Sequence, residues 1–245
     1  MKQIALVTGA GRGIGAATAQ ELARRGFHVI VNYRSDATAA ERVVKEIEAA
    51  GGTARAVRAD VCDPGQAAAL VGACDRVDAL VCNANISPPF APLAEMPWED
   101  FAGKVTGELA AAFHVTVQAL GRMRAQGGGR IVYVSSISAD HVRPGSIAHS
   151  TAKAALDTFA QHVAAEAGAW GIAVNTVSPG AVRTEGSAAV RTPEVEAALA
   201  RRAVLGRMLE PQDVAAVIGS VLGGGFDAVT GTRIPVDAGF RILPG

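Results

Sequence analysis

The chain has 245 residues, of which 49% are apolar, and its 23 Lys and Arg side chains balance 23 Asp and Glu side chains to a net charge of zero. A chain this long and apolar can bury a substantial core, and no linker-like run divides it, so we expect a single domain over residues 1–245. The charge balance argues against a nucleic-acid binder, which would carry a basic excess or a basic stripe.

Nothing in the sequence predicts a membrane or metal partner. The N-terminal run MKQIALVTGA is too short and too weakly charged for a signal peptide. No stretch of about 18 apolar residues is present to span a membrane. Cys62, Cys74 and Cys82 lack CxxC or Cys/His ligand spacing, so we interpret them as reduced thiols in or near the core of a cytoplasmic protein.

Short β-branched runs alternate with Ala-rich segments along the chain. The expected strands are 3–8, 28–33, 53–59, 77–82, 130–135, 172–178 and 232–237. The expected helices are about 13–25, 37–50, 64–73, 98–126, 147–168 and 211–222. Because several strands are continuous apolar runs, both faces of the sheet should be covered. The pattern predicts an α/β fold, a doubly wound Rossmann-type sheet of about seven parallel strands, with ligands beyond the carboxyl ends of the strands.

The first expected strand leads into TGAGRGIG, Thr8 to Gly15, and then into a helix. Glycines at such a turn let the backbone approach a pyrophosphate, and the helix amino terminus supplies N–H donors. The second strand ends in Tyr33 and Arg34, where an NAD-selective site usually has an acid. Arg34 and Arg12 could instead hold a 2′-phosphate, which favours NADP over NAD, or they could be solvated surface residues.

Together these residues resemble the short-chain dehydrogenase/reductase family over essentially the whole chain. The resemblance rests on Gly9-x3-Gly13-x-Gly15, on ADVCDP and CNAN, on RIVYVSS, on VSPGAVRT and on GTRIPVDAG. It implies NADP(H) as the cofactor. The contacts it implies are Thr8, Gly9, Gly11, Arg12, Gly13, Ile14, Gly15, Tyr33, Arg34, Asp60, Val61, Asn83, Ala84, Lys153, Pro179, Gly180, Val182 and Thr184.

Within the family, the chain looks most like β-ketoacyl-ACP reductases and polyketide-type ketoreductases. Those proteins are usually NADPH-dependent tetramers. The resemblance therefore implies a homotetramer, or a hetero-oligomer with a paralogous reductase, whose contacts lie on the helices near 98–126 and 147–168. It also implies a lid over the substrate cleft at about 183–207, and a small-molecule or carrier-bound acyl substrate.

The expected catalytic residues depart from the family pattern, which is Tyr-x3-Lys with a Ser thirteen residues before the Tyr. Ser136 and Lys153 are present at this spacing, but position 149 is His. The stretch ELAAAF puts Glu108 where the family has an Asn. In CNAN, Cys82 replaces an Asn, and Asn85 stands where a Gly is usual.

The charge of His149 decides what this site can do. The ammonium group of Lys153 should push the pKa of an imidazolium below about 6.5 and leave the ring neutral. A neutral imidazole is a poor general acid. If Glu108 neutralises Lys153, an imidazolium or a His–Glu relay becomes possible. His141 is either a second donor or substrate contact, or a solvated loop residue.

Three functions remain open from the sequence. The first is an NADPH-dependent reductase of a 3-oxoacyl thioester (ACP or CoA) or related ketone, with an atypical Ser136–His149–Lys153 site. The second is a weakly active or non-catalytic NADP-binding subunit paired with an active paralogue. The third is a non-redox dehydration or isomerisation with His149 as base.

Overall fold

A single seven-stranded parallel sheet organises the chain. The computed structural model describes residues 2–186 and 192–242. The strands are β1 (Ile4–Val7), β2 (His28–Tyr33), β3 (Thr53–Arg58), β4 (Ala79–Cys82), β5 (Gly129–Val134), β6 (Ile172–Pro179) and β7 (Arg233–Val236). They pair in the order β3-β2-β1-β4-β5-β6-β7. The order reverses beside β1, so the crevice between the carboxyl ends of β1 and β4 is the expected ligand site.

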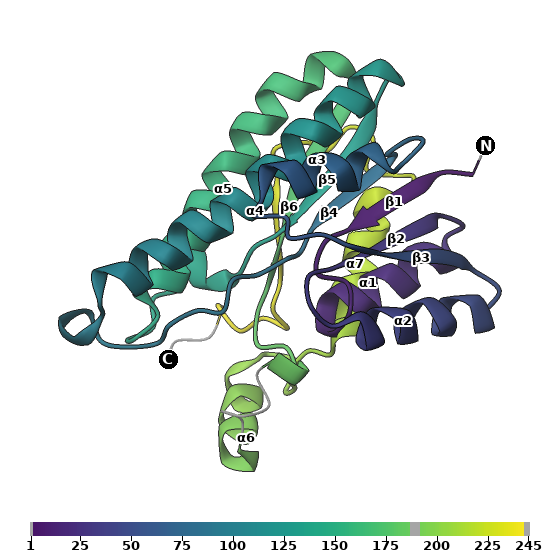
Figure 1. Ribbon diagram of the computed structural model, residues 1–245. Helices are drawn as coiled ribbons and strands as arrows, with labels where there is room; N and C mark the ends of the chain where they lie inside the picture. Colours follow the sequence, from purple (N-terminus) through teal and green to yellow (C-terminus); the bar gives the residue numbers. More distant parts are fainter. Residues whose placement is uncertain (1, 187–191, 243–245) are drawn as a thin grey trace.

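Helices cover both faces of this sheet (Figure 1). They are α1 (Gly13–Arg24), α2 (Ala37–Ala49), α3 (Pro64–Gly72), α4 (Trp98–Ala125), α5 (Ile147–Ala167), α6 (Pro193–Arg202) and α7 (Pro211–Leu222). One core packs α3, α4 and α5 against the sheet, and a second packs α1, α2 and α7 against the other face. Two buried faces explain why the strands are continuous apolar runs.

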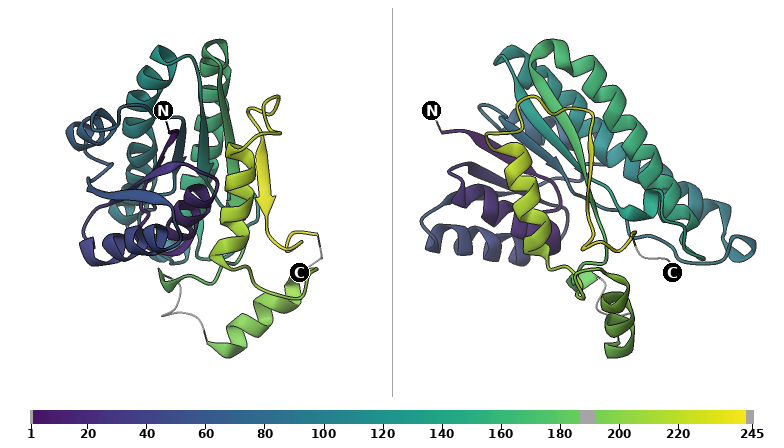
Figure 2. Two further views of the ribbon diagram at one scale, coloured as in Figure 1. Left: turned by 90° about the vertical axis from the view of Figure 1, so that its right-hand side faces the viewer. Right: turned by 180° about the vertical axis from the view of Figure 1, so that it is seen from behind.

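The predicted doubly wound fold is confirmed, and one helix was missed. The range predicted for β2 matches the structure, and the other strands differ from their predicted ranges by at most two residues at an end. The unpredicted helix, α6, has no buried residue and stands apart from the main body (Figure 2). Its local signals were readable: Thr192 caps it, Pro193 opens it, and Arg201 and Arg202 lie in its last turn.

The predicted lid, 183–207, falls partly outside the described residues, since 187–191 are not described. Its described part includes α6. Across the described residues, no helix combines the length and the hydropathy needed to cross a bilayer.

Candidate active site

The turn between β1 and α1 brings the backbone close to the loop after β4. Gly9 and Gly13 have φ of +62° and +56°, in the left-handed region that favours glycine. A Cβ on Gly15 would lie 2.4 Å from the carbonyl oxygen of Gly9 and 2.5 Å from Nδ2 of Asn83. Packing within the chain therefore excludes a side chain at Gly15, while the positive φ favours glycine at Gly9 and Gly13.

A hydrogen-bond network fixes this turn. Oγ1 of Thr8 accepts from the backbone N–H groups of Asn83 and Ala84, both at 3.0 Å. Nδ2 of Asn83 donates to the carbonyl oxygens of Thr8 and Gly9, at 2.9 and 3.1 Å. Asn32, which the sequence analysis did not single out, accepts from the Gly9 N–H at 3.3 Å and donates to the Ala59 carbonyl at 3.1 Å. These bonds connect the ends of β1, β2, β3 and β4 at the edge where the cofactor is expected.

The residues at this edge fit a dinucleotide. Arg12 precedes α1 in extended conformation and makes no capping side-chain hydrogen bond, and the first turn of α1 contains no acid. An uncapped helix amino terminus offers N–H donors to a pyrophosphate. Arg12 and Arg34 are exposed and form no ion pair with a described acid, so both can meet a 2′-phosphate. Ile14, Gly11 and Tyr33 line the same turn and strand end.

The other predicted cofactor residues follow strand ends. Asp60 accepts from the Cys62 N–H at 3.0 Å, and Val61 is buried beside it. Pro179 ends β6, and the Gly180 N–H donates to the Val236 carbonyl at 2.8 Å. Val182 bridges to Leu209. Thr184 faces the glycine turn, since a Cβ on Gly13 would lie 3.5 Å from its Cγ2.

The expected reacting residues lie at the carboxyl ends of β5 and on α5. Ser136 follows β5, and its Oγ accepts from the Ser138 N–H at 3.1 Å. Arg233 of β7, which the sequence analysis did not identify, donates to the Ser136 carbonyl at 2.9 Å and pairs with Asp157 of α5. His149 and Lys153 are four residues apart on α5, so they share one face of the helix.

His149 lies next to a cluster of charges with no hydrogen-bond partner on its buried nitrogen. Nδ1 of His149 is one of three buried side-chain polar atoms without a partner in the part of the chain that the structure describes. The ring of Phe90 lies 6.3 Å from the imidazole, centroid to centroid. Among the described contacts, no hydrogen bond therefore fixes which ring nitrogen of His149 carries the proton.

Glu108 joins two lysines in the interior. Its Oε1 accepts from Nζ of Lys153, and its Oε2 accepts from Nζ of Lys104, both at 2.5 Å. Lys104 also donates to Oδ1 of Asn85 at 2.8 Å and to the Ile86 carbonyl at 2.7 Å. Lys153 donates to the Val134 carbonyl at 2.8 Å. All three side chains of this charge cluster (Lys104, Glu108 and Lys153) are buried.

Lys104 was missed by the sequence analysis, and it changes the electrostatics. Burial lowers the pKa of Lys104, and Glu108 acts in the opposite direction. Three acceptors take up the three N–H bonds of its ammonium form, so it is charged. Burial alone would raise the pKa of Glu108, but the two ammonium groups outweigh it and lower that pKa to about 2. The cluster therefore has two positive charges and one negative charge.

Glu108 does not fully neutralise Lys153, so it does not restore the pKa of His149. Glu108 contacts Lys153, but it also pairs with Lys104. Burial, with Lys153 and Lys104 adding to it, lowers the pKa of His149 to about 4, against a smaller opposing effect of Glu108. The ring is neutral at pH 7, and the His–Glu relay has no direct contact among the described hydrogen bonds.

His141 and Cys82 have contacts of their own. His141 packs edge-on against Phe240, and its Nε2 lies 3.4 Å from Nη2 of Arg202. Burial raises the pKa of Cys82 to about 12, so its thiol stays protonated. No group of three His, Cys, Asp or Glu residues within the described chain could hold a metal ion.

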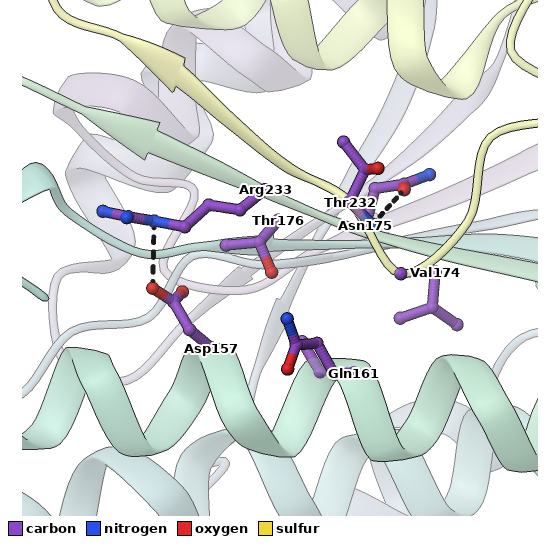
Figure 3. A pocket seen from close by; sticks show the side chains of 9 residues that line it. Asp157, Gln161, Val174, Asn175, Thr176, Thr232 and Arg233 are labelled. Carbon is purple, nitrogen blue, oxygen red and sulfur yellow. Dashed lines mark hydrogen bonds and ion pairs between the residues drawn. The ribbon is translucent and has the colours of Figure 1, made fainter. Parts of the chain in front are cut away.

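A small hollow between α5, β6 and β7 is a separate feature (Figure 3). It measures about 10 Å³, near the lower limit for one water molecule, and Asp157 and Arg233 face each other across its rim at 3.0 Å. Such a space is far too small for an organic substrate. Substrate binding is therefore expected at the carboxyl edge of the sheet.

Known proteins share this architecture. A family model described as "Enoyl-(Acyl carrier protein) reductase" matches residues 9–241. The chain belongs to the short-chain dehydrogenase/reductase family. It is 35% identical to an NADPH-dependent aldehyde reductase-like protein of Arabidopsis thaliana, over 97% of this chain and 94% of that one. It is 40% identical to a 3-oxoacyl-[acyl-carrier-protein] reductase of Synechocystis, over 75% of both chains.

Solved structures of the short-chain dehydrogenase/reductase family agree with this fold. A short-chain type dehydrogenase/reductase of Mycobacterium ulcerans superposes with a TM-score of 0.93 at 30% identity, covering 99% of this chain and 91% of that one. Membership of the family supports an oxidoreductase.

Gly15→Ala should disrupt the cofactor turn. The new Cβ would overlap the Gly9 carbonyl and the Asn83 amide. We expect a lower melting temperature and the loss of NADPH binding, measured by thermal unfolding and by NADPH fluorescence. Gly121→Ala is the matched control, because Gly121 also lies in a helix and a Cβ there meets no atom within 4 Å. Equal effects of the two variants would contradict the packing argument.

Glu108→Gln should destabilise the fold more than Lys104→Met. The first change leaves two buried ammonium groups without a carboxylate, which costs about 3–5 kcal/mol. The second leaves Glu108 paired one-to-one with Lys153. Equilibrium urea unfolding at pH 7, well above the Glu108 pKa of about 2, measures both. A larger loss of unfolding free energy for Lys104→Met than for Glu108→Gln would show that Glu108 does not stabilise both lysines.

Proposed function

We propose that this chain is an NADPH-dependent reductase of a 3-oxoacyl thioester (ACP or CoA) or a related ketone. The observation that carries the proposal is the position of Lys153 and His149. They share one face of α5, and Lys153 is held by the carbonyl of Val134 at the end of β5, next to Ser136. The glycine turn and the unpaired Arg12 and Arg34 support NADP(H), as do the relatives named for NADPH and for 3-oxoacyl-ACP reduction.

Each residue has a distinct task in this proposal. Bound NADPH would supply the hydride that the carbonyl carbon gains. The Ser136 hydroxyl donates a hydrogen bond to the carbonyl oxygen, and Lys153 binds the nicotinamide ribose. His149, in the position of the family's Tyr, gives its proton to the same oxygen as an imidazolium and then recovers one from solvent. Few His149 rings are charged at neutral pH, so turnover of a neutral ketone should be slow.

A second candidate is a weakly active subunit that binds NADP(H) and pairs with an active paralogue. The low pKa of His149 favours it, since the proton donor is mostly absent at pH 7. Phe113 and Val117 of α4 are exposed, at 49% and 47%, and Phe113 packs 6.2 Å from Phe159 of α5. This apolar face is where we propose that a second copy or a paralogue binds.

Purification from the native host separates the two candidates. Recovery of a second reductase chain, together with a large gain in activity for His149→Tyr, supports the subunit. Recovery of a homo-oligomer only, with a loss of activity for His149→Tyr, supports the reductase.

The pH dependence tests the role of His149. Above its pKa of about 4, the imidazolium fraction falls tenfold for each pH unit. We expect NADPH consumption with an acetoacetyl thioester to fall about tenfold per unit between pH 5 and pH 7, after correction for the acid decay of NADPH. His149→Phe should remove this slope and lower the rate at pH 5 about 100-fold. His162→Phe, an exposed change on the same helix, should keep the slope.

The 2′-phosphate contact is tested by Arg34→Ser. Removing one charge-assisted hydrogen bond should raise the KM for NADPH about tenfold and leave the KM for NADH unchanged. Steady-state kinetics with both cofactors measures this. Arg42→Ser, an exposed arginine of α2 that pairs with Glu46, is the control. If Arg34→Ser changes the KM for both cofactors equally, the arginine does not recognise the phosphate.

A further inference from the structure

The groups that act on His149 have an excess of positive charge. They are Lys153 of α5, Lys104 and Glu108 of α4, and Arg143 of the loop before α5. Three cations stand against one carboxylate. The chain as a whole is neutral, so this excess is local to the site. Lys104 and Lys153 are buried, whereas Arg143 is exposed. An uncompensated buried charge is costly unless a counter-charge arrives with a ligand.

Arg143 is held in place without an acidic partner. Its Nε donates to Oγ of Ser146 at 3.1 Å, and Ser146 is only 1% exposed. Its guanidinium carbon lies 5.2 Å from the centre of the Phe90 ring, which in turn lies 6.3 Å from the His149 ring. The Ala91 N–H donates to the Gly145 carbonyl at 3.1 Å and ties the Phe90 loop to the Arg143 loop. The Phe90 ring therefore neighbours both the Arg143 guanidinium and the His149 imidazole.

Other arginines around this edge are already neutralised. Arg233 and Arg241 both pair with Asp140. Arg183 pairs with Glu196 and Glu210. Among the described residues, Arg143 forms no ion pair with an acid, and its terminal nitrogens make no hydrogen bond with another described residue. A planar guanidinium of this kind is suited to a carboxylate, which it can bind through two parallel hydrogen bonds.

We propose that the substrate is an oxo acid whose carboxylate binds Arg143, and that this carboxylate offsets the positive charges that act on His149. The proposal rests on the proposed reductase function and narrows its substrate from ketones in general to those with an acid group close to the carbonyl. Neutral ketones and neutral thioesters would not offset these positive charges.

Binding of the carboxylate also changes the chemistry of His149. A negative charge beside the ring opposes the three cations and favours the imidazolium. In the reduction, the carbonyl carbon gains the hydride of NADPH, the carbonyl oxygen gains the proton of the imidazolium, and the products are a hydroxy acid, NADP⁺ and a neutral ring. An acidic substrate thus increases the fraction of His149 in the imidazolium form, which donates the proton. A neutral ketone does not.

Paired substrates test the proposal. Acetoacetate and methyl acetoacetate differ in the carboxylate and share the ketone. We expect Arg143→Met to raise the KM for acetoacetate at least tenfold and to leave kinetics with methyl acetoacetate within twofold of wild type. Arg124→Met is the matched control, because Arg124 also stacks on an aromatic ring, that of Trp170 at 4.8 Å, near the far end of α4. Arg124→Met should leave the KM for both compounds unchanged. Arg143→Lys should restore part of the acetoacetate binding that Arg143→Met loses.

A titration that needs no turnover provides the second measurement. In the NADPH complex, saturating butanoate should raise the NMR titration midpoint of His149 by one pH unit or more, and methyl butanoate should not. The shift should disappear in Arg143→Met and persist in Arg124→Met. Circular dichroism checks that each variant is folded.

The outcomes separate this proposal from the reductase function. Equal effects of Arg143→Met on both acetoacetate compounds, or no shift of His149 with butanoate, overturn the carboxylate site while leaving a ketone reductase. A butanoate shift that requires Arg143, in a protein that consumes NADPH with neither compound, supports the carboxylate site and overturns the reductase.

Discussion

One buried carboxylate shared by two ammonium groups determines the net charge of this site. Glu108 contacts Lys104 and Lys153 at 2.5 Å each, in a region from which water is largely excluded. Two lysines cannot be fully neutralised by one glutamate, so a positive charge persists beside the reacting centre. Burial, with that charge adding to it, lowers the pKa of His149 and keeps the ring neutral.

The same cluster connects the parts of the fold that must meet. Lys104 holds the loop after β4 through Asn85 and Ile86, and Lys153 reaches back to the end of β5. The loop after β4 also closes on the glycine turn through Asn83. The cofactor edge and the reacting residues are therefore coupled by direct contacts, and a change in the charge cluster should also affect how the glycine turn is held.

The sequence predicted the scaffold better than it predicted the charge balance. Apolar runs such as that of β2 and the helix periodicities were strong enough to give the sheet and six of the described helices, because both depend on local pattern. The proximity of Glu108 to Lys153 was also anticipated. Lys104 was not, although it lies four residues before Glu108 on the same helix, a spacing that brings two side chains together. Arg143 and Phe90 could not be paired from the sequence, since their contact joins two loops more than fifty residues apart.

The same positive charge acts in opposite ways on an imidazole and on a phenol. A phenol beside a positive charge becomes a better acid, whereas an imidazolium beside the same charge is discouraged. Under the proposed carboxylate site, an anion bound to Arg143 would also favour protonation of His149. Substrate recognition and proton donation would then depend on the same negative charge, and the site would select acidic substrates by charge as well as by shape.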